Sequence, residues 1–236
     1  MTLSQPHVLD NIRFHADVQA LAQRLRIRDG SASASTLHSL LDEAEKIARP
    51  KALYKVGFIE SRGDDWVVVE GTRLSSRVLR VNLEPSYRVF PYAATGGTEL
   101  DAWANSFPDL IQRFWADAIN EAALRVAFQV LNEHIAQEYR PGHLSHMNPG
   151  SLPDWPLDQQ RPLFAILGEV EPVIGVHLTD SLLMSPVKSV SGIFFPTEAT
   201  FESCQLCPRE QCRGRRAPYD ASLLDTRYRG AVTGGS

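Results

Sequence analysis

Three clustered cysteines carry the most specific chemical signal in this sequence. They lie in the stretch CQLCPREQC, residues 204–212, and the chain has no cysteine elsewhere. Thiolates two residues apart on a turn can hold one soft metal ion. An odd number of cysteines packed together also suits a reducing compartment better than a disulfide framework. The candidate metal ligands are therefore Cys204, Cys207 and Cys212.

Four arginines beside these cysteines, Arg209, Arg213, Arg215 and Arg216, would stabilise anionic thiolates. A zinc or iron–sulfur site would need a fourth ligand from a distant side chain, from solvent or from a partner chain. The spacing matches neither a four-cysteine ferredoxin run nor a zinc finger. Two interpretations stay open: a metal or cluster site, or reduced structural thiols with a solvated Arg-rich tail.

The stretch NPGSLPDWPLDQQ, residues 148–160, is a second candidate for chemistry. Pro149 and Gly150 predict a turn, and Asp154 can accept backbone N–H bonds. Trp155 either fills the core or lies against a planar ligand. The composition therefore predicts a shaped loop without naming a ligand.

Two histidines, His143 and His146, precede this loop without a carboxylate partner, a pattern more typical of plain polar residues than of a metal pair. The sequence contains no nucleophile elbow, no His-Glu-x-x-His, and no kinase or dinucleotide fingerprint. No reaction follows from motifs of these kinds.

The segment SYRVFPYAATGGTELDAW, residues 86–103, predicts a strand, a turn at Gly96 and Gly97, and a helix. Such turns often face a ligand, although glycines also serve simply to allow positive φ. No Gly-Lys-Ser/Thr follows, so this is not a Walker A loop.

The remaining pattern predicts an α+β fold rather than alternating βα units. Apolar spacing predicts helices over 8–27, 35–50, 107–139 and 158–170, a hairpin of the runs 52–61 and 65–71, and two strand-like segments in 175–198 joined through Pro186. We divide the chain into an N-terminal helical segment (1–50), an α+β domain with the cysteine cluster (51–220) and a tail (221–236).

Composition narrows the class of protein. With 236 residues and 43% apolar content, the chain can bury a sizeable core. A net charge of −4 gives no reason to expect nucleic acid or an anionic membrane as the main partner. No window approaches the ~18 apolar residues of a membrane span, and the N-terminus lacks an apolar signal region. We expect a soluble, cytoplasmic protein.

The segment PVIGVHLTDSLLMSPVKSVSGIFF is the most specific part of a family resemblance. It resembles the pattern IG-x-x-LT-x-S-x-x-M-x-P-x-x-SVSG-x-x-F of the reactivation domain of cobalamin-dependent methionine synthase and its stand-alone homologues. The preceding long helix and the stretch HMNPGS, in the place of the family's Arg-x-x-Pro-Gly-Tyr loop, follow the same order. The resemblance covers roughly residues 50–220. The matching positions are Gly175, Leu178, Thr179, Ser181, Met184, Pro186, Ser189, Val190, Ser191 and Gly192.

The resemblance implies a C-shaped or twisted, mostly antiparallel sheet with flanking helices, preceded by a small helical or mixed region. In the family, the domain caps a cobalamin that has slipped to the inactive cob(II) state. It supplies a methyl group from S-adenosylmethionine while an electron arrives from a reductase or flavodoxin. The implied partners are a corrinoid-binding protein or methyltransferase, which presents the cobalamin, and an electron donor protein.

The resemblance also implies a binding surface formed by the loop 146–155, the turn 94–100 and the segment 188–192. The candidate contact residues are His146, Asn148, Pro149, Gly150, Ser151, Asp154, Trp155, Thr95, Gly96, Lys188, Ser189 and Ser191.

Three positions depart from the family pattern. The family's loop Arg falls on His146, its Tyr on Ser151, and an acidic residue of the long helix on Arg125. Loss of a guanidinium–carboxylate pair alone predicts weaker binding of S-adenosylmethionine, by about 1.5–3 kcal/mol. Two functions follow: reactivation of a corrinoid-dependent methyltransferase, or a non-catalytic corrinoid-protein-binding module whose cysteines serve electron transfer or docking.

Overall fold

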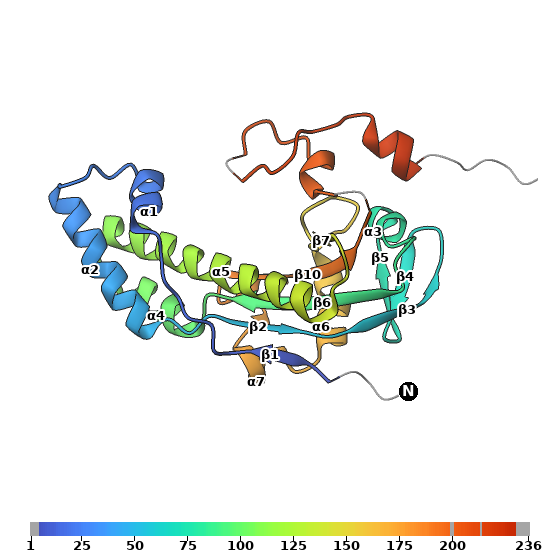
Figure 1. Ribbon diagram of the computed structural model, residues 1–236, viewed down its shortest axis with the longest axis horizontal. Coiled ribbons are helices and arrows are strands. Elements are labelled where there is room, and N and C mark those ends of the chain that lie inside the picture. The colour runs from blue at the N-terminus through green and yellow to red at the C-terminus, as the bar shows by residue number, and fades with distance from the viewer. Residues whose placement is uncertain (1–4, 199–200, 213, 230–236) are drawn as a thin grey trace, which may run out of the picture.

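The structure, a computed structural model, describes residues 5–198, 201–212 and 214–229. An eight-stranded antiparallel sheet curls into a half-barrel at its centre (Figure 1). Its strands are β1 (His7–Leu9), β2 (Lys51–Tyr54), β3 (Gly57–Arg62), β4 (Trp66–Val69), β5 (Thr72–Ser75), β6 (Arg88–Thr95), β7 (Leu144–Met147) and β10 (Ser189–Pro196). A separate two-stranded sheet consists of β8 (His177–Leu178) and β9 (Met184–Ser185).

Helices cover both faces of this sheet. They are α1 (Val18–Leu25), α2 (Ala32–Ile47), α3 (Arg77–Asn82), α4 (Thr98–Ser106), α5 (Leu110–Tyr139), α6 (Gln160–Leu167) and α7 (Val170–Ile174), with short 3₁₀ turns η1 (Leu157–Gln159) and η2 (Ser203–Leu206) and a π-helical turn η3 (Leu224–Arg229). The long helix α5 runs along the sheet, and α1, α2 and α4 gather at one end of it (Figure 1). No helix in the described part of the chain is both long and apolar enough to cross a membrane.

The register of the central strands decides which loops meet. Strand β6 pairs with β10 along most of its length, with Thr95 opposite Ser189 and Phe90 opposite Phe194. The other edge of β10 pairs with β7, with Met147 opposite Ile193. The loop that leaves β7 therefore starts beside the middle of β10.

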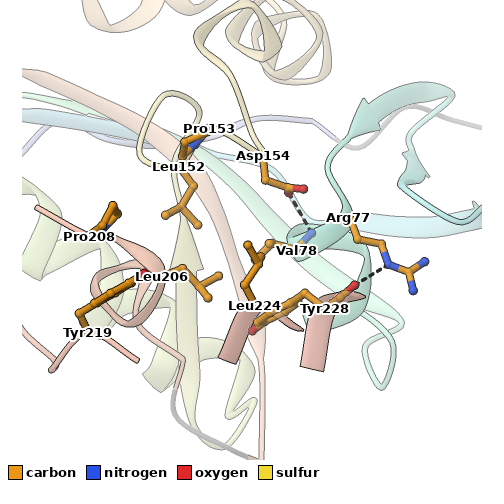
Figure 2. A pocket seen from close by; sticks show the side chains of 10 residues that line it. All are labelled: Arg77, Val78, Leu152, Pro153, Asp154, Leu206, Pro208, Tyr219, Leu224 and Tyr228. Atoms are coloured by element: carbon orange, nitrogen blue, oxygen red, sulfur yellow. Dashed lines mark hydrogen bonds between the residues drawn. The ribbon is translucent and has the colours of Figure 1, made fainter. Parts of the chain in front are cut away.

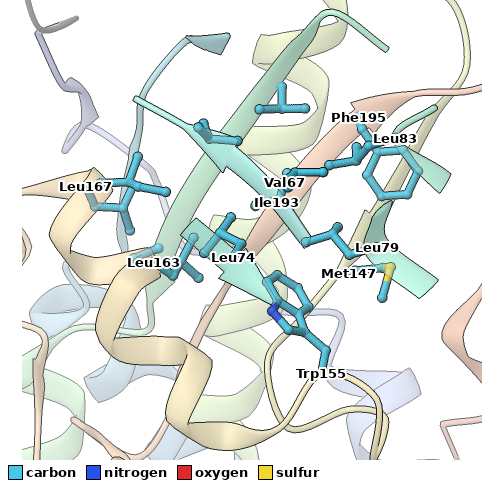
Figure 3. Close-up of a cluster of buried hydrophobic side chains, with 14 of the residues drawn as sticks. Val67, Leu74, Leu79, Leu83, Met147, Trp155, Leu163, Leu167, Ile193 and Phe195 are labelled. Carbon is cyan, nitrogen blue, oxygen red and sulfur yellow. The ribbon is translucent and has the colours of Figure 1, made fainter. Parts of the chain in front are cut away.

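The central strands are apolar on both faces because each face is covered. On β6, Phe90 and Tyr92 pack towards α5, whereas Val89 and Ala93 pack towards α6 and α7. This alternation follows from the two-residue period of a strand. Figure 3 shows part of the second core, in which Trp155 lies among Leu74, Leu79 and Met147.

The predicted α+β fold with an antiparallel sheet and flanking helices is confirmed. The predicted hairpin is the pair β3 and β4, and the predicted strand, glycine turn and helix are β6 and α4. The long helix begins at Leu110, because the Asp109 carboxylate accepts hydrogen bonds from two backbone N–H groups of the first turn.

The predicted helix over 8–27 is wrong in its first half. Residues 7–9 form β1, which pairs with β2 in the main sheet, and the helix spans only Val18–Leu25 after the cap Asp17. The apolar side chains of Ile12 and Phe14 are buried although this part of the chain is neither helix nor strand. Tertiary pairing therefore overrides the helical spacing of the first apolar positions.

The predicted helix over 158–170 is also not continuous. It divides into η1, α6 and α7. The break falls at Gly168, which ends α6 with a φ of 85°.

Candidate functional site

A groove of about 450 Å³ lies where the loop after β7 meets β10. Five of the residues predicted for the binding surface line it: Asn148, Pro149, Gly150, Ser151 and Ser191. The register of β7 on β10 brings these two distant sequence segments together.

The side chain of Asn148 fixes the start of the loop to the sheet. Its amide donates hydrogen bonds to the Tyr92 hydroxyl and to the carbonyl oxygen of Ser191, both at 2.7 Å. The amide fits only because residue 192 is glycine. A Cβ atom there would lie 2.6 Å from the Asn148 amide nitrogen and 2.3 Å from the Met147 carbonyl oxygen. The glycine of the SVSG segment is thus needed for the close approach of the loop.

The loop itself is a tight hydrogen-bonded turn. Gly150 has a φ of 83°, a conformation that favours glycine, and its N–H donates to the Trp155 carbonyl at 2.7 Å. The Ser151 N–H donates to the Asn148 carbonyl at 3.1 Å. The sequence signal of Pro149 and Gly150 therefore predicts this turn correctly.

Trp155 and Asp154 support the loop rather than line the groove. The Trp155 ring is fully buried in the core, among Leu74, Leu79 and Met147 (Figure 3). The Asp154 carboxylate accepts hydrogen bonds from the Ser76 hydroxyl and from the Val78 N–H, the latter at 2.9 Å, and so caps α3.

The other wall of the groove is mostly apolar. Leu157, Met184 and Val190 line it, together with Leu183 and Val187 at the rim, whose side chains are 58% and 75% exposed. Within the sequence resemblance, Met184 and Val190 are matching positions, but their contact with a groove appears only in three dimensions.

Gln160 is a groove residue that the sequence analysis misses. It is the first residue of α6, it is buried, and its side-chain oxygen accepts a hydrogen bond of 3.3 Å from the Ser191 hydroxyl. The available signal is a polar residue on the buried side of an apolar helix, which calls for a polar partner.

Four predicted residues form a second hydrogen-bonded cluster outside the lining of the groove. The Thr95 hydroxyl accepts hydrogen bonds from the Ser189 hydroxyl at 3.0 Å and from the Gly97 N–H at 3.1 Å. The Gly96 N–H donates to the Lys188 carbonyl at 2.9 Å. Lys188 also forms an ion pair of 2.9 Å with Asp117 of α5. This cluster joins the end of β6 to the start of β10.

His146 lies on the α5 face of the sheet, packed edge to face against Phe128 and Phe194 with ring centroids 5.1 and 5.5 Å apart. Its Nε2 atom is 3.2 Å from a terminal nitrogen of Arg216. Burial, together with the positive charge of Arg216, lowers the pKa of His146 to about 4. The imidazole is therefore neutral at pH 7 and can accept a hydrogen bond from the guanidinium.

Arg215 holds the cysteine segment, residues 204–212 and 214–217, in place, and the thiols are not grouped around a common point where a metal could bind. The Arg215 guanidinium donates to the carbonyl oxygens of Cys204 and Cys207 at 3.1 and 3.3 Å. Cys204 and Cys207 are half-buried, and Cys212 is exposed. Across the described ranges, no three His, Cys, Asp or Glu side chains are grouped so that they could hold a metal ion. The cysteines as arranged do not fit a zinc or iron–sulfur centre.

The comparisons with known proteins point to one architecture. The chain is similar to a crystal structure of the MetH reactivation domain bound to AdoHcy, with a TM-score of 0.59 and 17% sequence identity over 86% of this chain and 82% of that chain. This likeness is one of fold. No protein-family model and no curated protein matches the sequence.

A second cavity, of about 540 Å³, lies between the end of the loop, α3 and the C-terminal segment (Figure 2). Its walls are mainly apolar, with Leu152 on one side and Leu206 and Leu224 on the other. Arg77 donates from Nε to the Tyr228 carbonyl at 3.0 Å at its edge. The C-terminal segment therefore packs against the site region and leaves space beneath it.

The groove is built for binding rather than for acid–base chemistry. None of its eleven lining residues carries an acidic or basic side chain. Hydroxyl and amide groups at one end and an apolar wall at the other are typical of a site that orients an uncharged or locally charged small molecule.

Proposed function

We propose that this protein services a corrinoid-dependent methyltransferase by holding an S-adenosyl ligand in the groove between the 148–151 loop and β10. The observation that carries this proposal is the groove itself. The two segments on which the family resemblance rests, HMNPGS and SVSG, meet there, in a chain whose fold is similar to a reactivation domain bound to AdoHcy.

The dimensions and lining of the groove support a ligand of this class. A volume of about 450 Å³ lies within the range of sites that bind small molecules. The apolar wall of Leu157, Met184 and Val190 suits a purine ring or thioether chain. The Asn148, Ser191 and Gln160 end supplies hydrogen-bonding groups.

The chemistry of methyl transfer is consistent with a groove that lacks titratable groups. A sulfonium methyl that moves to cob(I) leaves a neutral thioether, so no proton has to be moved by the protein. The contribution of this chain would be to position the donor, which converts a rare encounter into an oriented one. The corrinoid and the electron would come from partner proteins.

A second candidate function is a module that binds a corrinoid protein without a methyl donor. The exposed apolar side chains of Leu183 and Val187 at the rim of the groove favour it, because exposed apolar groups together mark interaction surfaces. The absence of a charged residue from the groove lining also agrees with it.

Calorimetric titration of the purified protein with S-adenosylmethionine and S-adenosylhomocysteine tests the proposal. We expect saturable binding of both ligands. Ser151→Trp, which places a large ring in the groove, should abolish it, whereas Ser61→Trp at an exposed position of β3 should not.

Capture of a corrinoid-dependent methyltransferase on the immobilised protein separates the two candidates. Capture without ligand binding would favour the docking module. If neither the ligands nor the methyltransferase bind, the proposal is wrong.

A further inference from the structure

A carboxylate-bearing ligand in the groove needs a positive charge that the lining does not provide. The eleven lining residues include no lysine or arginine. An amino-acid carboxylate that loses water on binding must be paired with a donor or a charge, or its burial opposes binding. A positive charge that pairs with the carboxylate would have to come from a residue just beyond the lining.

Two nearby cations already have carboxylate partners. Lys188 forms an ion pair with Asp117, and only 19% of its side chain is exposed. Arg125 on α5 pairs with Glu121 at 2.8 Å. Both cations are therefore already paired with acidic residues of α5.

Arg216 has the position and the free donor that these two residues lack. Its Nε atom pairs with the Glu202 carboxylate at 2.8 Å, and one terminal nitrogen reaches His146 at 3.2 Å. The other terminal nitrogen has no partner in the described part of the chain. The side chain is 48% exposed. Two contacts thus orient a planar guanidinium and leave its third nitrogen able to bind another acceptor.

A chain of side-chain contacts links Arg216 to the polar end of the groove. His146 contacts Arg216, and its ring packs against Phe194 with centroids 5.5 Å apart. Asn148 is bonded to Tyr92, whose ring stacks on Phe194 with centroids 4.4 Å apart. Burial raises the pKa of Tyr92 above its usual range, and the Asn148 hydrogen bond and the Arg216 charge act in the opposite direction. The guanidinium charge therefore reaches the group that anchors the loop.

The cysteine segment has the contacts needed to hold Arg216 in place. Arg215 donates to four backbone carbonyls between residues 204 and 217, and the Arg216 N–H donates to the Cys204 sulfur at 3.4 Å. Adjacent arginines thus have different tasks: one closes the segment on itself and the other points to His146. The four carbonyls are those of Cys204, Cys207, Arg209 and Ala217.

We propose that Arg216 binds the carboxylate of the ligand seated in the groove, and that the folded cysteine segment positions it. This inference rests on the proposed function, since it takes an S-adenosyl amino acid as the ligand. It assigns the C-terminal segment to the binding site through one guanidinium.

The test compares two ligands on matched variants by calorimetry. S-Adenosylhomocysteine carries the carboxylate, and 5′-methylthioadenosine lacks the amino-acid group. Arg216→Gln should raise the dissociation constant of S-adenosylhomocysteine about tenfold to hundredfold, as expected for a lost charge-assisted hydrogen bond. The dissociation constant of methylthioadenosine should change by less than about twofold. Arg216→Lys, which keeps the charge, should lie between. The matched control is Arg161→Gln, an exposed arginine next to Gln160.

The outcomes separate this inference from the proposed function. If the unaltered protein binds neither ligand, the proposed function fails and the inference fails with it. If the unaltered protein binds both ligands, and Arg216→Gln weakens the binding of both equally or of neither, only the role assigned to Arg216 is wrong. If Arg161→Gln, rather than Arg216→Gln, weakens the binding of S-adenosylhomocysteine but not of methylthioadenosine, Arg161 is the residue that binds the carboxylate. Equal melting temperatures of the variants confirm that they are folded. If Arg216→Gln does not fold, the same comparison is made with Arg216→Lys. A selective loss of S-adenosylhomocysteine binding then supports the role of Arg216, and an equal effect on both ligands contradicts it.

Discussion

At the scale of single residues, the site depends on polar side chains that are satisfied by one or two specific partners. Asn148 joins Tyr92 to the backbone of β10, and His146 stays neutral while it accepts from Arg216. The protonated form of His146 is unfavourable here, because the charged ring would be poorly hydrated and would lie next to the positive charge of Arg216. Protonation of His146 should therefore oppose folding.

The stability of the protein should fall in acid partly because of His146. Its pKa is about 4 in the folded chain and about 6.5 in the unfolded chain, so the unfolded state binds the extra proton between these values. The contribution is fully present above pH 6.5 and is lost as the pH falls towards 4, to a total of about 2–3 kcal/mol.

Urea unfolding at several pH values measures this effect. The free energy of unfolding of His146→Gln should depend less on pH between 6.5 and 4 than that of the unaltered protein. His38→Gln, at an exposed position of α2, is the control and should follow the unaltered protein. Parallel curves for all three proteins would contradict the assignment.

At the scale of secondary-structure elements, the groove is the junction of β7, β10 and α6, and α3 holds the loop from behind. Asp154 serves two elements at once, since its carboxylate caps α3 while its backbone belongs to the loop. The loop is thus fixed at one end by Asn148 and at the other by Asp154 and Trp155.

Removal of the Asp154 carboxylate should destabilise the fold. Asp154→Ala leaves the Val78 N–H and the Ser76 hydroxyl without their acceptor, at a cost of about 1–2 kcal/mol. Thermal unfolding should show a lower melting temperature, and Asp158→Ala, an exposed residue of η1, should change it little. An unchanged melting temperature for Asp154→Ala would mean that the cap is not formed.

Sequence reasoning succeeds where a local pattern and the fold agree. Neighbouring residues are enough to predict the turn at Pro149 and Gly150, the long helix expected over 107–139 and the strand before the turn at Gly96 and Gly97. It fails where a partner distant in sequence decides. Strand β1 forms because β2 offers an edge, and Gln160 lines the groove only because Ser191 lies opposite. The contact of Arg216 with His146 spans 70 residues, so no local pattern predicts it.

At the scale of the whole molecule, the described C-terminal residues pack on the core as far as Tyr228. Tyr228 is fully buried in the core shared with Trp155. Its hydroxyl donates to the Asn82 side chain at 2.9 Å, and its carbonyl accepts from Arg77. Tyr228 is therefore fixed to α3, and the cysteine segment with Arg216 lies in the chain between β10 and this anchor.

Loss of this anchor should cost as much stability as loss of a core aromatic residue. Tyr228→Ala removes a fully buried ring and should lower the free energy of unfolding by about 3–5 kcal/mol. Tyr228→Phe should cost less, about 1–3 kcal/mol, because only the Asn82 oxygen loses its donor. Tyr219→Ala is the matched control, since that ring is 47% exposed, and should cost less than about 1 kcal/mol. Urea denaturation measures all three.

Because the same anchor holds the cysteine segment, Tyr228→Ala should also speed cleavage by trypsin near Arg209 and Arg215 under native conditions. A variant with near-normal stability and unchanged cleavage would show that the segment folds independently of Tyr228, and the route by which α3 helps to position Arg216 would then be wrong.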